Sequence, residues 1–379
     1  MRTGTIDRIA AALCCSLLLL VLTGCGAVPN PVADEARTLE SPRPTDPEGL
    51  RVMVYYDMEG LSGQDDPDTF RYSKPAAYRL GRQLLTDDVN AVIDGLFAGG
   101  ALLVDVVDAH GSGNWSEPDI LLDRMDPRAT AVFRDEAFRP YVDLVEPDLY
   151  DAVVVVGMHA STGRGGFASH TWTLGMDIVM NDMPLTETEI IGYAWGRVGV
   201  PVILATGDDR LGAQLAGSMP WVEYVTVKTA TSASSAELRP VAEVHAEMRE
   251  AASRALRHRD QARAMRIGEP VRAALRAVPP ASVEMFRDVP GLDYDGDSVA
   301  FTAANFQAAF DGVIALTGIA RFGYQQVLLE SVRAHHDGEQ IMADYSDRLF
   351  RRWLDYESGR WTPPEPPTPP ADQRFFGSR

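Results

Sequence analysis

The stretch of sequence that decides the fold is residues 52–60, VMVYYDMEG. It begins with an uninterrupted apolar run, Val52–Tyr56, and passes directly into Asp57, Glu59 and Gly60. An apolar run without alternation indicates a strand that is covered on both faces, which is the usual situation in a parallel sheet. Binding sites of α/β proteins form beyond the carboxyl ends of such strands. Residues 52–60 therefore predict a central strand that carries acidic groups to a site.

Three further apolar runs resemble the first: Leu102–Val107, which only Asp105 interrupts, Val153–Val156 and Val200–Ala205. Between the first two runs, apolar residues recur from Leu80 to Leu96 at spacings near three and four, and Gly99-Gly100 follow. This pattern is typical of an amphipathic helix with a glycine cap. The repeated order of strand, helix and strand predicts an α/β fold with a doubly wound, mostly parallel sheet, accompanied by a second, smaller α+β domain.

Each of the four runs ends in acidic or imidazole side chains beside Gly or Ala: Asp57-Met58-Glu59-Gly60, Asp108-Ala109-His110-Gly111, Gly157-Met158-His159-Ala160 and Gly207-Asp208-Asp209-Arg210. One such group alone would indicate only a hydrogen-bonded loop residue. Four of them are expected to meet, because the carboxyl ends of parallel strands lie on one edge of a sheet. Carboxylates and imidazoles without sulfur suit a catalytic Zn, Mn, Fe or Co site better than a structural zinc site.

The seven histidines divide into two groups. His110, His159 and His170 lie in the region of these strands, and His170 follows a glycine-rich stretch, residues 163–166, that could let it close over a metal ion. A loop histidine held only by hydrogen bonds is the alternative for His170. The others stand in charged, helix-like stretches and are expected on solvated helix faces: His245, His258, His335 and His336.

Composition excludes several classes of function. The chain has 379 residues, with 35 Lys and Arg against 54 Asp and Glu, and a formal net charge of −19. No nucleic-acid partner is expected, because neutralising phosphates requires a basic face. All 3 cysteines lie within the first 25 residues, so the folded body has no disulfide framework, cysteine nucleophile or cysteine-ligated metal. Lys228 could serve a substrate carboxylate or pair with an acidic neighbour.

The N-terminus has the pattern of an export signal. Arg2 and Arg8 are followed by an apolar run, Ile9–Leu22, that is too short for a spanning helix, and then by Thr23-Gly24-Cys25. This end of the run resembles a bacterial lipobox, which predicts a signal peptide over residues 1–24 and a lipid on Cys25. The alternative is an ordinary cleaved signal with an incidental cysteine. The lipid anchor would attach the protein to the membrane, either on the outer side of the cell membrane or in the periplasm.

The remaining domain boundaries follow from composition. Residues 25–49 are a Pro-rich tether, residues 50–225 the α/β metal-binding catalytic domain, and residues 226–320 the smaller α+β domain. Within the smaller domain we expect a helix in 245–263, strands at Val283–Phe286 and Val299–Phe301, and an apolar helix at Phe306–Ile319. Residues 321–360 are a helical C-terminal extension, and residues 361–379 a Pro-rich disordered tail.

From Asp57 to about residue 320, the chain resembles the D-aminopeptidases of the DppA type, peptidase family M55. The resemblance rests on an ordered series of motifs: Asp57-x-Glu59-Gly60, Asp108-x-His110-Gly111, Gly157-x-His159-Ala160, Ser169-His170, Asn181-Asp182-x-Pro184 with Glu187, Gly207-Asp208-Asp209-Arg210 and Val227-Lys228. It implies a two-domain α/β protein with a two-zinc site and assembly into a ring-like homo-oligomer.

The resemblance also implies roles for single residues. The metal ligands would be Asp57, which bridges both ions, with Glu59, His110, His159 and Glu187, and His170 would be the catalytic histidine. Glu189 is the alternative to Glu187, which keeps the family's spacing from Pro184. Tyr55 stands where the family usually has Ser, so its contact behind the ligands is expected to differ.

The expected activity is metal-dependent hydrolysis of short peptides that begin with a D-amino acid. The preference for D-residues comes from the resemblance alone, and the substrate-binding residues stay unassigned. Asp208 or Asp209 could hold the substrate amine, but capping of a helix that starts near Leu211 is the preferred interpretation. Two other interpretations are a non-catalytic lipoprotein that binds metal or peptide for transport, and a metallophosphatase or related esterase.

Overall fold

The structure is a computed structural model that describes residues 49–114, 116–279, 281–320, 324–360, 362 and 373–377. The predicted signal peptide, Cys25 and almost the whole tether lie outside the described residues, so their assignment stays a prediction. Among the described helices, none is long and apolar enough to cross a membrane.

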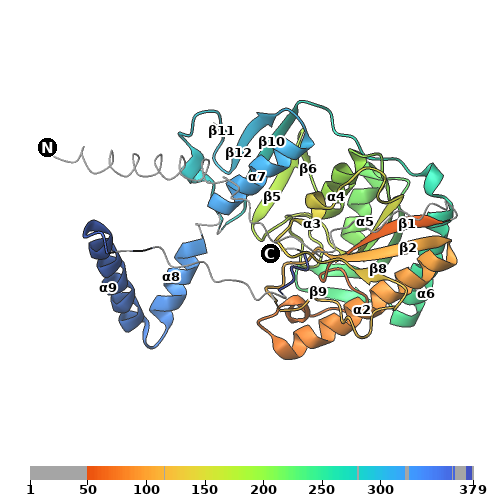
Figure 1. Ribbon diagram of the computed structural model, residues 1–379, viewed down its shortest axis with the longest axis horizontal. Coiled ribbons are helices and arrows are strands. Elements are labelled where there is room, and N and C mark those ends of the chain that lie inside the picture. The colour runs from red at the N-terminus through yellow and green to blue at the C-terminus, as the bar shows by residue number, and fades with distance from the viewer. Residues whose placement is uncertain are drawn as a thin grey trace, which may run out of the picture. The chain divides into compact units, whose positions relative to one another are not determined.

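A seven-stranded sheet forms the centre of the α/β part, in the order β3-β2-β1-β4-β7-β8-β9 (Figure 1). Every neighbouring pair is parallel except the β8–β9 hairpin. The four strands predicted from apolar runs are all present, and the sheet comprises β1 (Leu50–Tyr56), β2 (Ala101–Asp108), β3 (Thr130–Ala131), β4 (Ala152–Met158), β7 (Val202–Asp208), β8 (Glu223–Ser232) and β9 (Ser235–Leu238).

Helices cover both faces of this sheet. One face packs against α2 (Pro75–Ala98) and α6 (Val241–Arg257), and the other against α3 (Pro140–Asp143), α4 (Glu187–Gly196) and α5 (Asp209–Ser218). The apolar run of β1 is continuous because both of its faces are buried. Val52 and Val54 belong to the hydrophobic core under α2 and α6, and Met53 and Tyr55 to the core under α3, α4 and α5. The doubly wound arrangement is therefore confirmed.

A second, antiparallel sheet has the order β11-β12-β10-β5-β6 and packs against α7 (Phe306–Ala320). Its strands are β5 (Met176–Met180), β6 (Met183–Pro184), β10 (Val271–Ala277), β11 (Asp293–Tyr294) and β12 (Ser298–Ala303). The strand predicted at 283–286 is wrong, because Glu284–Phe286 form a 3-10 helix, η3. Two further 3-10 helices are η1 (Pro67–Phe70) and η2 (Arg259–Gln261).

The boundary predicted between residues 225 and 226 needs correction. It falls inside β8, and α6 beyond it covers the parallel sheet rather than the smaller one. Conversely, β5 and β6 precede the boundary but pair within the antiparallel sheet. The two sheets are therefore not consecutive in the sequence: β5 and β6 of the antiparallel sheet precede β7 to β9 of the parallel sheet, and β10 to β12 follow them.

The C-terminal part contains two helices and a short docked segment. Helices α8 (Tyr324–Ala334) and α9 (Gly338–Glu357) form a hairpin whose arms meet at the turn and diverge from it, in agreement with the predicted helical extension (Figure 1). The prediction that all of 361–379 is disordered is wrong for residues 373–377. Two isolated bridges, Phe375 to Arg134 and Gly377 to Asp108, join this segment to the chain beyond β3 and to the end of β2.

Candidate metal centre

The carboxyl edge of the parallel sheet gathers the predicted ligands. Asp57 and Glu59 follow β1, His110 follows β2 and His159 follows β4, while Glu187 is the first residue of α4. All five side chains are buried. The sequence prediction that separate strand ends deliver these groups to one place is therefore reproduced by the geometry.

Glycines allow the ends of β1 and β4 to approach this closely. The Gly60 nitrogen donates to the Gly157 carbonyl at 2.7 Å. A Cβ atom on Gly60 would lie 1.9 Å from the Met158 oxygen, and one on Gly157 would lie 2.2 Å from the Asp57 oxygen. Gly157 also has φ of +75°, a conformation that a side chain disfavours. Backbone contact thus fixes the spacing between Asp57 and His159.

Asp57 lies between two histidines and offers a different oxygen to each. Its Oδ1 is 3.0 Å from His110 Nδ1, which is also 3.0 Å from Glu59 Oε2. Its Oδ2 is 3.3 Å from His159 Nε2, which is 3.7 Å from Glu187 Oε2. The side chains at the centre thus form two compact groups that share Asp57, one with Glu59 and His110 and the other with His159 and Glu187. A third such group joins Glu59 and His159 with His170.

Two atoms at this position lack hydrogen-bond partners among the described residues: Asp57 Oδ2 and His159 Nε2. Their 3.3 Å separation does not have hydrogen-bond geometry. Buried polar atoms are nearly always paired, so two orphaned atoms facing each other fit a site for a cation. The donor set of carboxylates and imidazoles fits zinc.

Crowded negative charge dominates the electrostatics of the site. Burial and the neighbouring Asp57 raise the pKa of Glu59 to about 7. Burial alone would raise the pKa of Asp57 and lower that of His159. The hydrogen bond from His110 and the positive charge of His159 instead hold the pKa of Asp57 well below its usual range, and Glu187 and Asp57 raise the pKa of His159 to about 10. The carboxylates therefore favour positive charge beside them, which protons or metal cations can supply.

Backbone carbonyls orient both histidines. His159 Nδ1 lies 3.0 Å from the Ala160 oxygen, and His110 Nε2 lies 3.0 Å from the Phe70 oxygen. Because a carbonyl only accepts, the nitrogen facing it carries a proton, and the other ring nitrogen faces the carboxylates, where it carries a second proton or, once deprotonated, could bind a metal ion. His159 therefore presents Nε2 to the centre, and His110 presents Nδ1.

Glu187 and Glu189 are distinguished by their partners. Glu187 faces the centre, where its Oε1 accepts from the Trp172 nitrogen at 2.6 Å and its Oε2 from the Tyr141 hydroxyl at 2.5 Å. Glu189 instead forms a capping box with Thr186 at the start of α4. Of the two alternatives, only Glu187 is placed to bind a metal at this centre.

His170 lies directly against the predicted ligands. Its ring stacks on His159, with centroids 4.2 Å apart, and its Nε2 is 3.9 Å from Glu187 Oε1. Burial, and then the charge of His159, lower its pKa to about 3, so the ring is neutral. Ala168 and Trp172, two residues away on either side, have φ of +52° and +66°. Such strain in non-glycine residues tends to accumulate at functional sites.

Tyr55, which replaces the family's usual serine, makes its contacts behind the centre. Its hydroxyl donates to the Pro140 carbonyl at 2.9 Å and accepts from Trp195 Nε1 at 2.8 Å. Pro140 is followed by Tyr141, the partner of Glu187. Sequence reasoning missed Tyr141, because one tyrosine in a one-turn helix carries no recognisable motif.

Lys228 supports the loop that carries Glu59, and among the described residues it forms no ion pair with an acidic side chain. It is fully buried, and its Nζ donates to the Glu59 carbonyl at 2.7 Å and to Gln64 Oε1 at 2.7 Å. The same nitrogen lies 3.9 Å from the centre of the Phe167 ring. Lys228 therefore holds the loop that carries Glu59 rather than a substrate carboxylate.

Two acidic residues are explained by helix capping and backbone contacts. Asp208 is the N-cap of α5 and accepts from the Leu211 nitrogen at 2.9 Å, which confirms the preferred interpretation. Asp209 accepts from the Ala230 nitrogen at 2.7 Å.

The solvated position predicted for His245 is wrong, since its Nε2 lies 2.8 Å from the fully buried Asp88.

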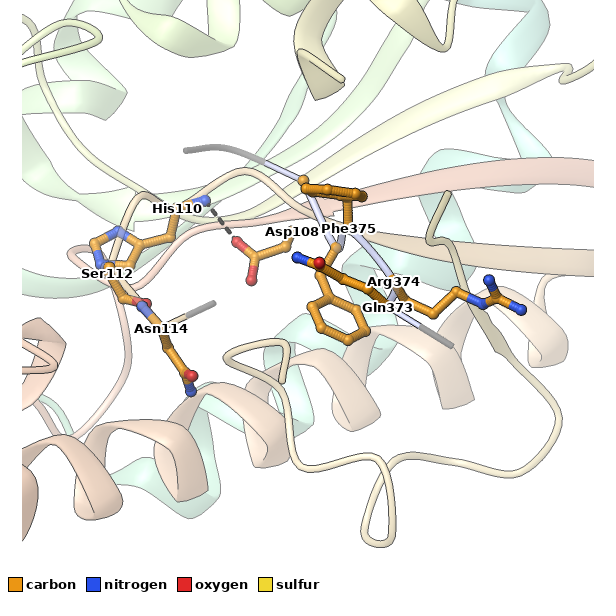
Figure 2. A pocket seen from close by; sticks show the side chains of 10 residues that line it. Asp108, His110, Ser112, Asn114, Gln373, Arg374 and Phe375 are labelled. Atoms are coloured by element: carbon orange, nitrogen blue, oxygen red, sulfur yellow. Dashed lines mark hydrogen bonds between the residues drawn. The ribbon is translucent and has the colours of Figure 1, made fainter. Parts of the chain in front are cut away.

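A cavity of about 280 Å³ adjoins His110 (Figure 2). One side is lined by Asp108, His110, Ser112 and Asn114, and the docked C-terminal segment, residues 373–377, lines the other. Asp108 accepts from the His110 nitrogen at 2.8 Å, drawn as a dashed line in Figure 2.

Comparison with known proteins agrees with this fold and centre. The D-aminopeptidase of Bacillus subtilis (strain 168) is 26% identical over 276 residues, which cover 72% of this chain and 98% of that protein. A solved structure, the Zn-dependent D-aminopeptidase DppA from Bacillus subtilis, described as a self-compartmentalizing protease, superposes with a TM-score of 0.65 at 24% identity, covering 72% of this chain and 98% of that one. The sequence pattern of peptidase family M55, described as D-aminopeptidase, matches residues 50–314. The chain belongs to peptidase family M55.

Proposed function

We propose that the protein is a zinc-dependent aminopeptidase that binds two zinc ions and hydrolyses short peptides with an N-terminal D-amino acid. The observation that carries this proposal is the pair of ligand groups that share the buried Asp57. One ion would be held by Asp57, Glu59 and His110, and the other by Asp57, His159 and Glu187. Bound zinc supplies a water of pKa about 7 and polarises the scissile carbonyl.

The protein's own groups orient the reactants and move the proton. His170 Nδ1 lies 2.8 Å from the Ala168 carbonyl and therefore carries the ring proton, which leaves a lone pair on Nε2. A His159 bound to metal would lack the proton charge that helps to lower the pKa of His170, and the free Nε2 of His170 could then accept a proton from the attacking group and return it to the leaving amine. Proton transfer by a positioned side chain typically contributes about 10²–10⁴-fold to the rate. Tyr141 and the Trp172 nitrogen hold Glu187 in place during the reaction.

The decisive test compares kcat/KM for D-Ala-D-Ala, D-Ala-Gly-Gly and L-Ala-Gly-Gly on zinc-loaded protein, with and without a chelator. We expect cleavage that the chelator abolishes and that favours the D-peptides. Preference for the L-peptide would contradict the stereochemical part alone. Zinc binding without cleavage of any peptide would favour a binding lipoprotein, and turnover of a phosphate ester would favour a phosphatase.

A second test separates the roles within the centre. We expect His110→Ala and His159→Ala to bind less metal than the parent protein, and His170→Ala to keep its metal and lose activity. Loss of metal from His170→Ala would make His170 a ligand instead.

We further propose that Cys25 is lipidated and anchors the protein on the outer side of the membrane or in the periplasm. The support is the apolar run that ends in Leu22-Thr23-Gly24-Cys25. Cys25→Ala should release the protein into soluble fractions or leave the precursor uncut. Unchanged processing and membrane fractionation of this variant would contradict the proposal.

A further inference from the structure

The C-terminal segment 373–377 lies outside the part of the chain that matches the family, residues 50–314. It is nevertheless attached to the sheet edge beside the candidate metal centre. The Phe375 nitrogen donates to the Arg134 carbonyl at 2.7 Å, and the Arg134 nitrogen donates to the Phe375 carbonyl at 2.9 Å. A strand that pairs with a free sheet edge in this way binds through its main chain.

Side chains strengthen the attachment. Phe375 packs against the main hydrophobic core, and the Phe376 ring meets the Phe133 ring edge-on at 6.1 Å. Arg374 forms an ion pair with Asp135. Apolar, aromatic and charged contacts therefore all hold the segment at one place.

Gly377 makes the closest approach to the sheet. It has φ of +148° and forms a bridge with Asp108 at the end of β2. A Cβ atom at this position would lie 2.0 Å from the Asp108 backbone oxygen. Only glycine fits here without displacement, so the segment can be detached by a single methyl group.

The attached segment forms one wall of the 280 Å³ cavity, and the proposed ligand His110 lies in the opposite wall (Figure 2). Ligand pockets usually measure about 300–1,000 Å³, so this cavity suits a ligand of one or two amino-acid residues. Ser112 and Asn114 line the same wall as His110, and internal hydrogen bonds hold both side chains: Ser112 donates to Asp119 Oδ1 at 2.8 Å and Asn114 to the Tyr78 hydroxyl at 3.2 Å. Of the five proposed ligands, His110 lines this cavity, so the segment limits the free space on the His110 side of the centre.

We propose that residues 373–377 are a specificity-determining wall of the substrate cavity, which restricts the enzyme to very short peptides. The inference rests on the proposed aminopeptidase function. It means that the C-terminal segment of the same chain selects substrate peptides by their length, whether or not subunits assemble.

Two variants of the full-length protein test the wall: a chain that ends at Arg360, and Gly377→Ala. Gly291→Ala is the matched control, because Gly291 also has positive φ, +85°, and its added Cβ meets nothing within 4 Å. Hydrogen exchange at the Phe375 amide reports attachment of the segment without reference to activity. Calorimetry on zinc-loaded proteins carrying His170→Ala gives affinities for D-Ala-Gly and D-Ala-Gly-Gly-Gly, and kcat/KM for both peptides is measured on the active proteins.

We expect the Phe375 amide to be protected in the parent and in Gly291→Ala and to exchange freely in Gly377→Ala. Detaching or removing the segment should raise the preference for the tetrapeptide over the dipeptide roughly 10-fold, both in affinity and in kcat/KM. The proposal is contradicted if the Phe375 amide is unprotected in the parent, or if all proteins show the same preference between the two peptide lengths. If the affinities shift but no protein cleaves a D-peptide, the wall stands and the proposed function fails.

Discussion

At the scale of single residues, two glutamates in the first turn of α4 have opposite tasks. Glu187 points to Asp57 and His159, and Glu189 turns back to the backbone nitrogen of Thr186. The pair shows how a helix N-terminus can serve a site and its own stability with neighbouring carboxylates.

Glu187→Ala and Glu189→Ala should therefore fail in different ways. Glu187→Ala removes a ligand, so metal analysis should show less bound metal than in the parent. Glu189→Ala removes half of the capping box, so the free energy of unfolding should fall by about 0.5–2 kcal/mol while metal content stays unchanged. Equal metal loss in both variants would contradict the assignment of Glu187.

At the scale of elements, the contact between the ends of β1 and β4 sets the geometry of the centre. The Asp57 nitrogen donates to the Val156 carbonyl at 2.8 Å, and Gly157 then lets the two chains stay in contact. Ligands from two strands can share one oxygen-rich site only because no side chain separates their backbones.

Gly157→Ala and Gly163→Ala test this contact as a matched pair. Both residues have positive φ, +75° and +78°, but an added Cβ at Gly163 meets nothing within 4 Å. Backbone strain alone should cost each variant about 1–2 kcal/mol of unfolding free energy. Gly157→Ala should lose more than about 3 kcal/mol in total and bind less metal, because the new methyl also displaces Asp57. Equal effects in denaturant titrations and metal analysis would refute the role of the contact.

Helices α2 and α6 are joined by a buried charge contact that predicts a pH-dependent stability. The hydrogen bond to Asp88 raises the pKa of His245 above its usual 6.5. A raised pKa stabilises the fold most below the unfolded value, about 6.5, and this stabilisation is lost as pH rises through the folded value.

His245→Ala should thus cost more at low pH than at high pH. The measurement is urea unfolding in the presence of a chelator, which removes any contribution from metal loss. At pH 6 the free energy of unfolding of the variant should be about 1–2 kcal/mol lower than that of the parent, and this difference should shrink by pH 9. A deficit that stays constant over this range would show that the charge of His245 contributes nothing.

At the scale of the whole molecule, the C-terminal helices present apolar side chains on their surface. Leu349, Phe350 and Trp353 of α9 are 55%, 58% and 52% exposed. Exposed apolar groups gathered on one element are typical of surfaces that associate. Helix α9 lies beyond residues 50–314, the part of the chain that matches the family, so this apolar surface belongs to the C-terminal extension.

If α9 associates with a second copy of the chain, light scattering on the parent protein should give a multiple of the 41.4 kDa chain mass, less any part removed by processing. Changing Leu349, Phe350 and Trp353 together to Asn should lower the mass, while Ser346→Asn with Asp347→Asn should not. An unchanged mass in the triple variant would exclude α9 from the contact, and a monomeric parent would contradict the oligomer itself.

The sequence by itself determined the strands of the parallel sheet and most of the centre. Continuous apolar runs fix β1, β2, β4 and β7 locally, and parallel strands necessarily bring their carboxyl ends to one edge. For this reason Asp57, Glu59, His110 and His159 were expected at one edge without knowledge of any long-range contact, and the family resemblance then selected them as ligands over Asp108 and Asp208. The choice of Glu187 over Glu189 depended on family spacing, since local pattern cannot tell which carboxylate faces inward.

Only the tertiary structure decided the contacts between distant segments. Lys228 reaches the Glu59 carbonyl across 169 residues, His245 reaches Asp88 across 157, and β5 and β6 join a sheet whose other strands come much later. The docking of residues 373–377 is of the same kind. Hydrophobic periodicity describes which face of an element is buried but not what covers it, so these partners emerge only when the whole chain packs.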